Sequence, residues 1–361
     1  MTTNLRKLED ESLFDVDGAE TPPTDIVAYN ELRSCADLYR MHAQKILDIH
    51  PEFQREVVWP GVAQTRFVDS LIKQLPIPSM CFGLDNKQQK WIVIDGLQRM
   101  HTIVRFLEGG DWTLSKLSDI DQAIAGKSVA AIKPDGSALH GYYTRVENLS
   151  IPITVLRCDF TKKNHLEYLN TIFHRLNAGG VKLNNQEIRN CIYGGALNSL
   201  LRELDKYPAW RKMNRMKAGE TYRFTKQERI LRFLSLEENY KKYDGHLATF
   251  LNDFMFNNRS AKFEYLEAKR LLFSKSVDCL FEKALSGSPP SAPATVIEAA
   301  LVGIGRNLQQ LTTKSPTQIA AMYRKLTTHS HFQEAALAEG LSKKPKVIER
   351  LDTAVQIFAG M

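Results

Sequence analysis

Residues able to bind an anion or a metal follow one another where a predicted strand meets a predicted helix, in the stretch WIVIDGLQRMH (91–101). A helix start carries unpaired backbone amides and partial positive charge, so it suits an anion such as phosphate. Gly96 lets the backbone approach a ligand, and Arg99 in the first turn could add a charge-assisted bond to phosphate. Asp95 could hold a magnesium ion, a ribose hydroxyl or the helix start as its N-cap. In the plainer interpretation, Asp95 only caps the helix and Arg99 is solvated.

The helix after Gly96 has an apolar stripe that must face a core, formed by Leu97, Met100, Ile103, Val104 and Leu107. This spacing directs Gln98, Arg99 and Thr102 toward the other side and leaves His101 near the boundary. The junction therefore presents a polar face beside the expected anion site.

Two further segments combine polar and aromatic residues. HPEFQREVVWP (50–60) carries Gln54 and Arg55, and on its own it is typical of an ordinary strand edge. FHRLNAGGVKLNNQE (173–187) joins Arg175 and Asn177 to a glycine turn and a new helix. On its own this second pattern indicates a helix-loop-helix in which Asn177 is a C-cap.

A basic stretch, WRKMNRMKAGETYRF (210–224), is the best candidate for contact with DNA. Its basic residues are Arg211, Lys212, Arg215, Lys217 and Arg223. Basic residues neutralise phosphates, and the interleaved aromatic residues Trp210, Tyr222 and Phe224 can stack on bases. A solvated basic loop is the equally weighted alternative.

The elements that position these residues change in kind along the chain. Strands are predicted within PIPSMCFGL, WIVI and IPITVLRCDF, with a helix over GVAQTRFVDSLIKQL and poor signals between Leu114 and Val146. Helical patterns follow from about residue 161, one of them opened by a capping-box arrangement of Asn184 and Glu187. We expect an α+β protein with an acidic disordered tail at 1–25, a mixed α/β domain at 26–160, and a mostly helical domain at 161–361 with a surface loop near 286–295.

Composition sets broader limits. The chain has 361 residues with 43% hydrophobic content, and no apolar run approaches the roughly 20 residues of a membrane span. Its N-terminus lacks the apolar core of a secretory signal, so a cytoplasmic protein is expected. The five cysteines lack ligand spacing, which indicates reduced and mostly buried thiols. The net charge is +7 although the first 25 residues hold seven acids and two bases, so the body is basic enough to suit a polyanion.

The order of the segments FQREVVW, PIP, IDGLQRMHTI and FHRLNAGGVKLNNQEIR is far more specific than any one of them. Together they resemble the GmrSD-type family of bacterial restriction proteins, whose N-terminal domain has a ParB-like fold. The family pattern is an F-Q-R-x-x-V-W segment, a D-G-Q-Q-R segment, and an F-x-R-x-N segment leading into L-N-x-Q-E. The resemblance covers roughly residues 40–255.

The resemblance implies nucleotide chemistry with Mg²⁺, because family members bind or hydrolyse nucleoside triphosphates and couple this to cutting phage or modified DNA. It implies nucleotide-binding roles for Gln54, Arg55, Gly96, Arg99, Phe173, Arg175 and Asn177. It likewise implies catalytic roles for Asp95, Gln98 and Arg99, with Asp95 also the metal ligand, and we expect His101, two residues beyond the motif, to act with them. Convergence of the three arginines on one pocket would supply the positive charge that a triphosphate needs.

Two departures from the family qualify this expectation. The first glutamine of D-G-Q-Q-R is Leu97 here, so hydrolysis could be slow or lost. Many relatives append a nuclease domain with a His-Asn-His metal site, and no such pattern follows residue 260, where His329 and His331 stand in a Ser/Thr-rich turn.

We expect an anti-phage protein that binds and hydrolyses a nucleoside triphosphate, whose base the sequence does not specify, to control DNA recognition or cleavage. The first alternative is a non-catalytic, nucleotide-gated DNA-binding scaffold that recruits a nuclease or another defence protein. The second alternative is a metal-dependent nuclease within the ParB-like domain.

Overall fold

The computed structural model describes residues 21–49, 59–176, 183–218, 222–337 and 340–360. The chain forms two compact units, which we call the sheet unit (18–183) and the helical unit (184–361). The boundary lies after the helix at 163–176, which the sequence analysis assigned to the helical domain. The predicted disorder at 1–25 remains a prediction for residues 1–20, which lie outside the described residues.

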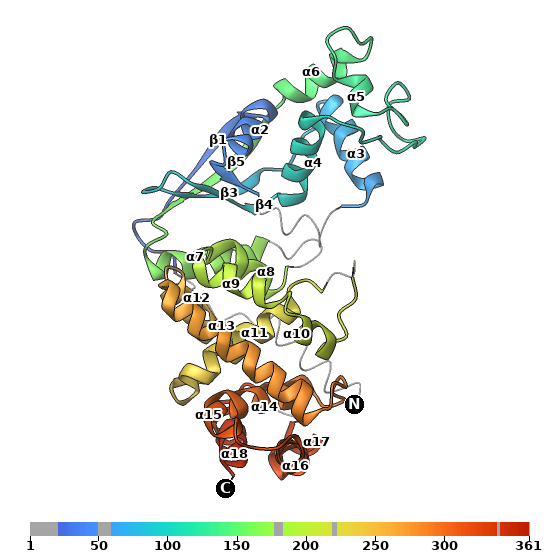
Figure 1. The fold of residues 1–361 in the computed structure, drawn as a ribbon. Coiled ribbons are helices and arrows are strands. Elements are labelled where there is room, and N and C mark those ends of the chain that lie inside the picture. The colour runs from blue at the N-terminus through green and yellow to red at the C-terminus, as the bar shows by residue number, and fades with distance from the viewer. Residues whose placement is uncertain (1–20, 50–58, 177–182, 219–221, 338–339, 361) are drawn as a thin grey trace. The chain divides into compact units, whose positions relative to one another are not determined.

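A five-stranded mixed sheet forms the centre of the sheet unit, in the strand order β1-β5-β3-β4-β2 (Figure 1). The strands are β1 (Val27–Ser34), β2 (Leu47–Asp48), β3 (Met80–Asp85), β4 (Trp91–Asp95) and β5 (Ser150–Cys158). β1 pairs antiparallel with β5 and β3 pairs antiparallel with β4, whereas β3 and β5, and β2 and β4, run parallel. β4 therefore lies inside the sheet, between β3 and β2.

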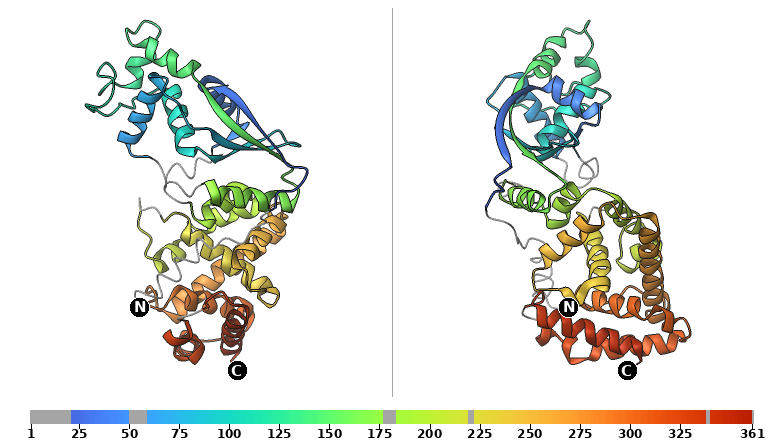
Figure 2. Two further views of the ribbon diagram at one scale, coloured as in Figure 1. Left: turned by 180° about the vertical axis from the view of Figure 1, so that it is seen from behind. Right: turned by 90° about the vertical axis from the view of Figure 1, so that its left-hand side faces the viewer.

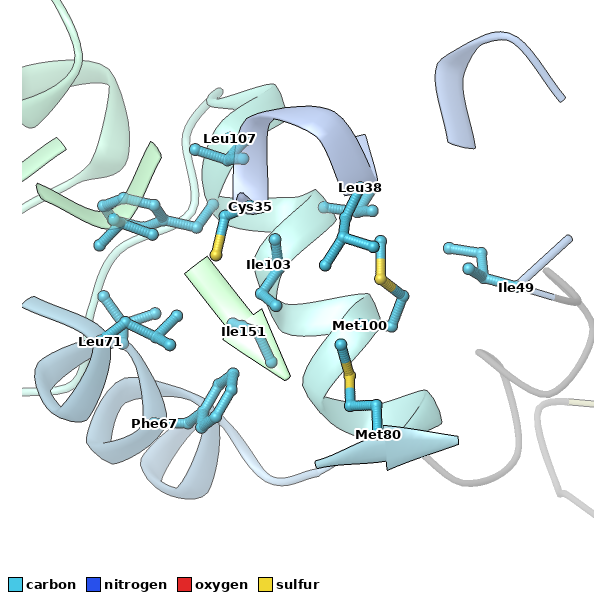
Figure 3. Close-up of a cluster of buried hydrophobic side chains, with 14 of the residues drawn as sticks. Cys35, Leu38, Ile49, Phe67, Leu71, Met80, Met100, Ile103, Leu107 and Ile151 are labelled. Carbon is cyan, nitrogen blue, oxygen red and sulfur yellow. The ribbon is translucent and has the colours of Figure 1, made fainter. Parts of the chain in front are cut away.

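Helices cover this sheet and form its core. They are α2 (Cys35–Ala43), α3 (Gly61–Ile72), α4 (Leu97–Glu108), α5 (Val129–Ile132), α6 (His140–Asn148) and α7 (Lys163–Leu176). Figure 3 shows Met100 and Ile103 of α4 among apolar side chains from α2, α3, β3 and β5. α7 packs against β4, so both β4 and the helix that follows it are fixed by burial.

The helical unit contains no strand among its described residues. Its elements are α8 (Asn185–Ile192), α9 (Ala196–Leu204), α10 (Pro208–Met213), α11 (Thr225–Asn239), η4 (Tyr240–Lys242), α12 (Leu247–Asn258), α13 (Phe263–Asp278), η5 (Cys279–Ala284), α14 (Ala294–Arg306), α15 (Leu308–Leu311), α16 (Pro316–Thr328), η6 (Ser330–Phe332), α17 (Glu334–Leu337) and α18 (Lys344–Ala359). α14 and α18 lie side by side (Figure 2), and they approach closely because Gly303 has no side chain: an added Cβ would lie 2.7 Å from the carbonyl oxygen of Ala354.

The expected fold class is confirmed: a mixed α/β N-terminal part precedes a mostly helical remainder. The predicted loop near 286–295 lies between η5 and α14, which begins at Ala294. None of the described helices is both long and apolar enough to cross a bilayer.

Candidate functional site

The junction between β4 and α4 is built around Gly96. Residues 91–94 of β4 are buried, and Asp95 ends the strand partly exposed. Gly96 has φ 94°, in the left-handed region, and a Cβ at this position would lie 2.5 Å from Cγ of Met80. Gly96 is itself the N-cap of α4, so the N-cap residue has no side chain that could bond to the first amides of the helix. The interpretation of Asp95 as the helix cap is thus wrong, and the helix start retains its capacity for an anion.

Arg99 is held against the end of β4 rather than in solvent. Its Nη2 donates to Oδ2 of Asp95 at 2.7 Å, and its guanidinium also donates to the carbonyl oxygens of Pro78 and Ser79. The side chain of Arg99 is 14% exposed and that of Asp95 is 33% exposed. Burial lowers the pKa of Arg99, and the charge of Asp95 opposes this effect. The alternative of a solvated Arg99 is therefore wrong.

Gln98 fixes the chain at Trp59. Oε1 of Gln98 accepts the Trp59 backbone amide at 2.8 Å, and Nε2 of Gln64 donates to the Trp59 carbonyl at 2.7 Å. Nη1 of Arg105 donates in turn to Oε1 of Gln64 at 2.8 Å. Trp59 directly follows 50–58, so Gln54 and Arg55 lie outside the described residues. The described geometry gives Gln98 a positioning role at the edge of that segment.

The other polar residues of α4 differ in how they are placed. Nδ1 of His101 is buried and has no hydrogen-bond partner in the described part of the chain. Burial lowers the pKa of His101, and the charges of Arg105 and His42 lower it further. Thr102, expected on the polar side, is fully buried, and its hydroxyl donates to the carbonyl of Gln98 at 2.8 Å. Leu97 is partly buried against the core, as its place in the apolar stripe predicted.

The third motif segment is only partly described. Phe173 on α7 is 1% exposed, which gives it a place in the core rather than on a surface open to a ligand. Arg175, at the end of the same helix, is exposed. Asn177 lies outside the described residues, as Arg55 does, so the convergence of three arginines on one pocket remains a prediction.

A buried polar network around α8 is a feature that sequence reasoning missed. The capping box of Asn184 and Glu187 is present as predicted, yet all eight residues of the polar α8 are also buried. Arg189, 2% exposed, donates to Glu228 at 2.9 Å and to Asn252 at 2.8 Å. These bonds satisfy polar groups that would be costly to bury alone, so the L-N-x-Q-E segment stabilises the helical unit. The density of polar residues in a helix that also contains Ile188 and Ile192 was the available signal.

The basic stretch at 210–224 is divided between the core and the surface. Trp210 is 1% exposed and packs on Phe273, so it is not available to stack on a base. Arg223 forms a bidentate pair with the fully buried Glu187, at 2.9 and 2.6 Å, and thereby has a structural role. The remaining basic residues lie on α10 or just after it, exposed or partly exposed: Arg211, Lys212, Arg215 and Lys217.

The donor set at the junction suits a metal ion only in part. Mg²⁺ keeps several waters and binds through one or two carboxylates together with substrate phosphates. Asp95 has one oxygen engaged by Arg99, and no group of three or more His, Cys, Asp or Glu residues gathers anywhere in the described chain. The junction alone therefore offers a metal ion few protein ligands. The five cysteines are free and buried, as predicted.

Comparison with known proteins gives this geometry a family context. Residues 35–194 match the family description "GmrSD restriction endonuclease, N-terminal domain". The chain carries a GmrSD-type N-terminal domain. The matched range includes the β4–α4 junction, α7 and the whole of α8. No curated protein and no solved structure matched the chain.

Proposed function

We propose that the GmrSD-type domain binds a nucleoside triphosphate with Mg²⁺ at the β4–α4 junction and uses it to control action on DNA. The observation that carries the proposal is a helix start whose N-cap, Gly96, has no side chain, combined with the largely buried Arg99 in the first turn of the same helix. Backbone amides at a helix N-terminus and an arginine fork both favour phosphate oxygens.

The ion pair gives each residue a separate role. Arg99 has five N–H donors, and those now directed at the carbonyls of Pro78 and Ser79 could donate to phosphate instead. Asp95 keeps the guanidinium oriented, and its carboxylate would supply one oxygen ligand to Mg²⁺ when the nucleotide is bound. When present, the metal ion would neutralise phosphate charge.

The same geometry favours slow turnover. Hydrolysis needs a group that orients the attacking water. Leu97 stands where the family has its first glutamine, and Oε1 of Gln98 is engaged by the backbone of Trp59. Leu97 offers no amide to a water, and the bond to Trp59 holds the Gln98 side chain in one orientation. This favours the second candidate function, a nucleotide-gated switch that recruits a nuclease partner.

DNA as the substrate is supported by the restriction endonuclease family. Within the helical unit, the exposed or partly exposed basic residues on and after α10 are suited to phosphate contacts. The residues proposed to contact DNA are Arg211, Lys212, Arg215 and Lys217. Arg223 is not among them, because it pairs with the buried Glu187.

One experiment separates the candidate functions. Pure protein is incubated with Mg²⁺, plasmid DNA, and ATP, GTP, CTP or UTP in turn, and phosphate release and DNA cutting are both measured. We expect one nucleotide to bind and to be hydrolysed slowly, without cutting by the chain alone. Cutting that needs Mg²⁺ but no nucleotide would instead support a nuclease within this domain, and absence of binding to all four nucleotides would overturn the proposal.

A further inference from the structure

A second group of basic side chains lies in the helical unit, on segments outside the stretch at 210–224. We call it the basic surface, and it consists of five exposed residues: Lys241, Lys242, Arg306, Lys343 and Lys344. They come from η4, the end of α14 and the start of α18. η4 packs against α18, which brings sequence-distant positive charges together.

The turn that carries Lys343 and Lys344 is held in place by buried groups. The hydroxyl of Tyr243, a fully buried residue, donates to the carbonyl of Ser342 at 2.6 Å. Arg350, 6% exposed, donates to the carbonyl of Leu341 at 2.6 Å. The two lysines therefore extend from an ordered turn, which lowers the entropy that binding would cost.

The remaining charges are arranged around Tyr240. Lys241 and Arg306 both lie over its ring, with 5.0 and 5.3 Å from the cation to the ring centroid. Asp352 pairs with Lys241, and Asp244 lies in the following turn. These two acids leave the surface positive, because Lys242, Lys343 and Lys344 form no ion pair within the described residues.

We propose that the basic surface binds the phosphate backbone of duplex DNA. The proposal rests on DNA being the substrate, as inferred above. Tyr240 and Tyr243 are 4% and 0% exposed, so neither ring is available to stack on single-stranded bases. The exposed large hydrophobic residues of the described chain lie on other elements, so the surface lacks the apolar anchors of a membrane-binding face.

The basic surface is separate from the basic residues near α10. The α10 residues precede the start of α11 and η4 follows its end, and α11 has 15 residues. A helix of that length measures about 22 Å, so the two groups would contact phosphates several base pairs apart. Their contributions to DNA affinity should add, because residues this far apart rarely couple.

A charge-matched pair of variants tests the surface. The test variant is Lys242→Gln/Lys343→Gln/Lys344→Gln, and the control is Lys262→Gln/Lys275→Gln/Lys314→Gln, which removes three positive charges from other elements. Binding to a duplex of mixed sequence is measured between ~50 and ~200 mM salt. We expect the log–log salt slope of the test variant to shrink by about 2 to 3, since each lost phosphate contact removes about 0.9. The control should keep the wild-type slope.

Equal slopes for test and control variants would overturn the surface as a DNA contact. Loss of binding to phosphatidylserine vesicles with unchanged duplex binding would overturn it in favour of a membrane. Nucleotide binding is measured on the same samples: if wild type binds no nucleotide while the test variant still loses slope, the proposed nucleotide function fails and the DNA surface stands.

Discussion

Nη2 of Arg99 lies 2.7 Å from Oδ2 of Asp95, four residues earlier in the chain. The pair joins the last residue of β4 to the first turn of α4, across the left-handed Gly96. In the absence of a ligand, the Asp95 carboxylate orients the Arg99 guanidinium. When a nucleotide is bound, the same carboxylate competes with phosphate for that guanidinium. Variants of these two residues can therefore distinguish nucleotide binding, which should depend on Arg99, from the effect of Mg²⁺ on that binding, which should depend on Asp95.

Gly96 should be far less replaceable than a glycine nearby that has a similar φ angle. Gly96→Ala would combine a strained φ of 94° with a Cβ only 2.5 Å from Met80. Gly110, with φ 89° and no atom within 4 Å of a Cβ added there, is the matched control. We expect a loss of about 1 kcal/mol in the free energy of unfolding for Gly110→Ala and about 2–4 kcal/mol for Gly96→Ala. Urea denaturation measures both, and equal losses would contradict the steric account.

Much of the sheet unit was predictable because its pattern is local. The run at 91–94 and the stripe of α4 predicted β4 and α4, since burial follows strand and helix periods closely there. β1 was missed because its sequence, VAYNELRS, forms an edge strand whose residues are mostly exposed, so it lacks a buried stripe.

The polar contacts were harder to predict, since they depend on residues distant in sequence. The bond of Gln98 to Trp59 spans 39 positions, and the pair of Glu187 and Arg223 spans 36. Trp210 was expected at the surface beside basic residues, yet it packs on Phe273 of α13. Such partners are set by tertiary packing, which no local pattern specifies.

Glu187 should contribute more to stability than an equivalent capping residue at the surface. It is fully buried, caps α8 and accepts both hydrogen bonds from Arg223, whereas Gln318 holds the same position in the exposed capping box of α16. We expect Glu187→Ala to lower the free energy of unfolding by about 3 kcal/mol, as for a broken buried pair. Gln318→Ala should cost about 0.5–1 kcal/mol. Thermal and urea unfolding measure both losses. Equal losses of unfolding free energy in the two variants would mean that the buried pair of Glu187 and Arg223 does not contribute to stability.

His101 should make stability depend on pH. Its folded-state pKa lies below the ordinary value of 6.5, chiefly because of burial, so the folded state binds fewer protons than the unfolded state under mildly acidic conditions. The stabilising effect is present above pH 6.5 and is lost as pH falls through the lowered folded-state pKa. His101→Leu should flatten the decline in unfolding free energy below pH 6.5, as measured by denaturation at a series of pH values. If the unfolding free energy of His101→Leu declines with pH as that of wild type does, other titrating groups cause the decline.

Leu97→Gln restores the family residue and should raise nucleotide turnover. The new amide could orient a water beside the phosphates, which Leu97 cannot do. Leu97→Met, which keeps an apolar side chain, is the control and should leave turnover unchanged. Single-turnover phosphate release and equilibrium affinity are measured together. If Leu97→Gln keeps its nucleotide affinity but does not hydrolyse the nucleotide faster, Leu97 is not the cause of slow hydrolysis.

The most direct measurement is equilibrium binding of each nucleoside triphosphate, with Mg²⁺ or with EDTA, to wild type and three variants. Arg99→Ala should weaken binding by about 1.5–3 kcal/mol, tenfold to a hundredfold. Arg66→Ala, a charge-matched control whose guanidinium pairs with the exposed Asp119 in the same unit, should bind as wild type does. Asp95→Asn should still bind without metal and lose only the gain that Mg²⁺ gives. Wild-type affinity in Arg99→Ala, for a nucleotide that wild type binds, would contradict a phosphate site at this junction.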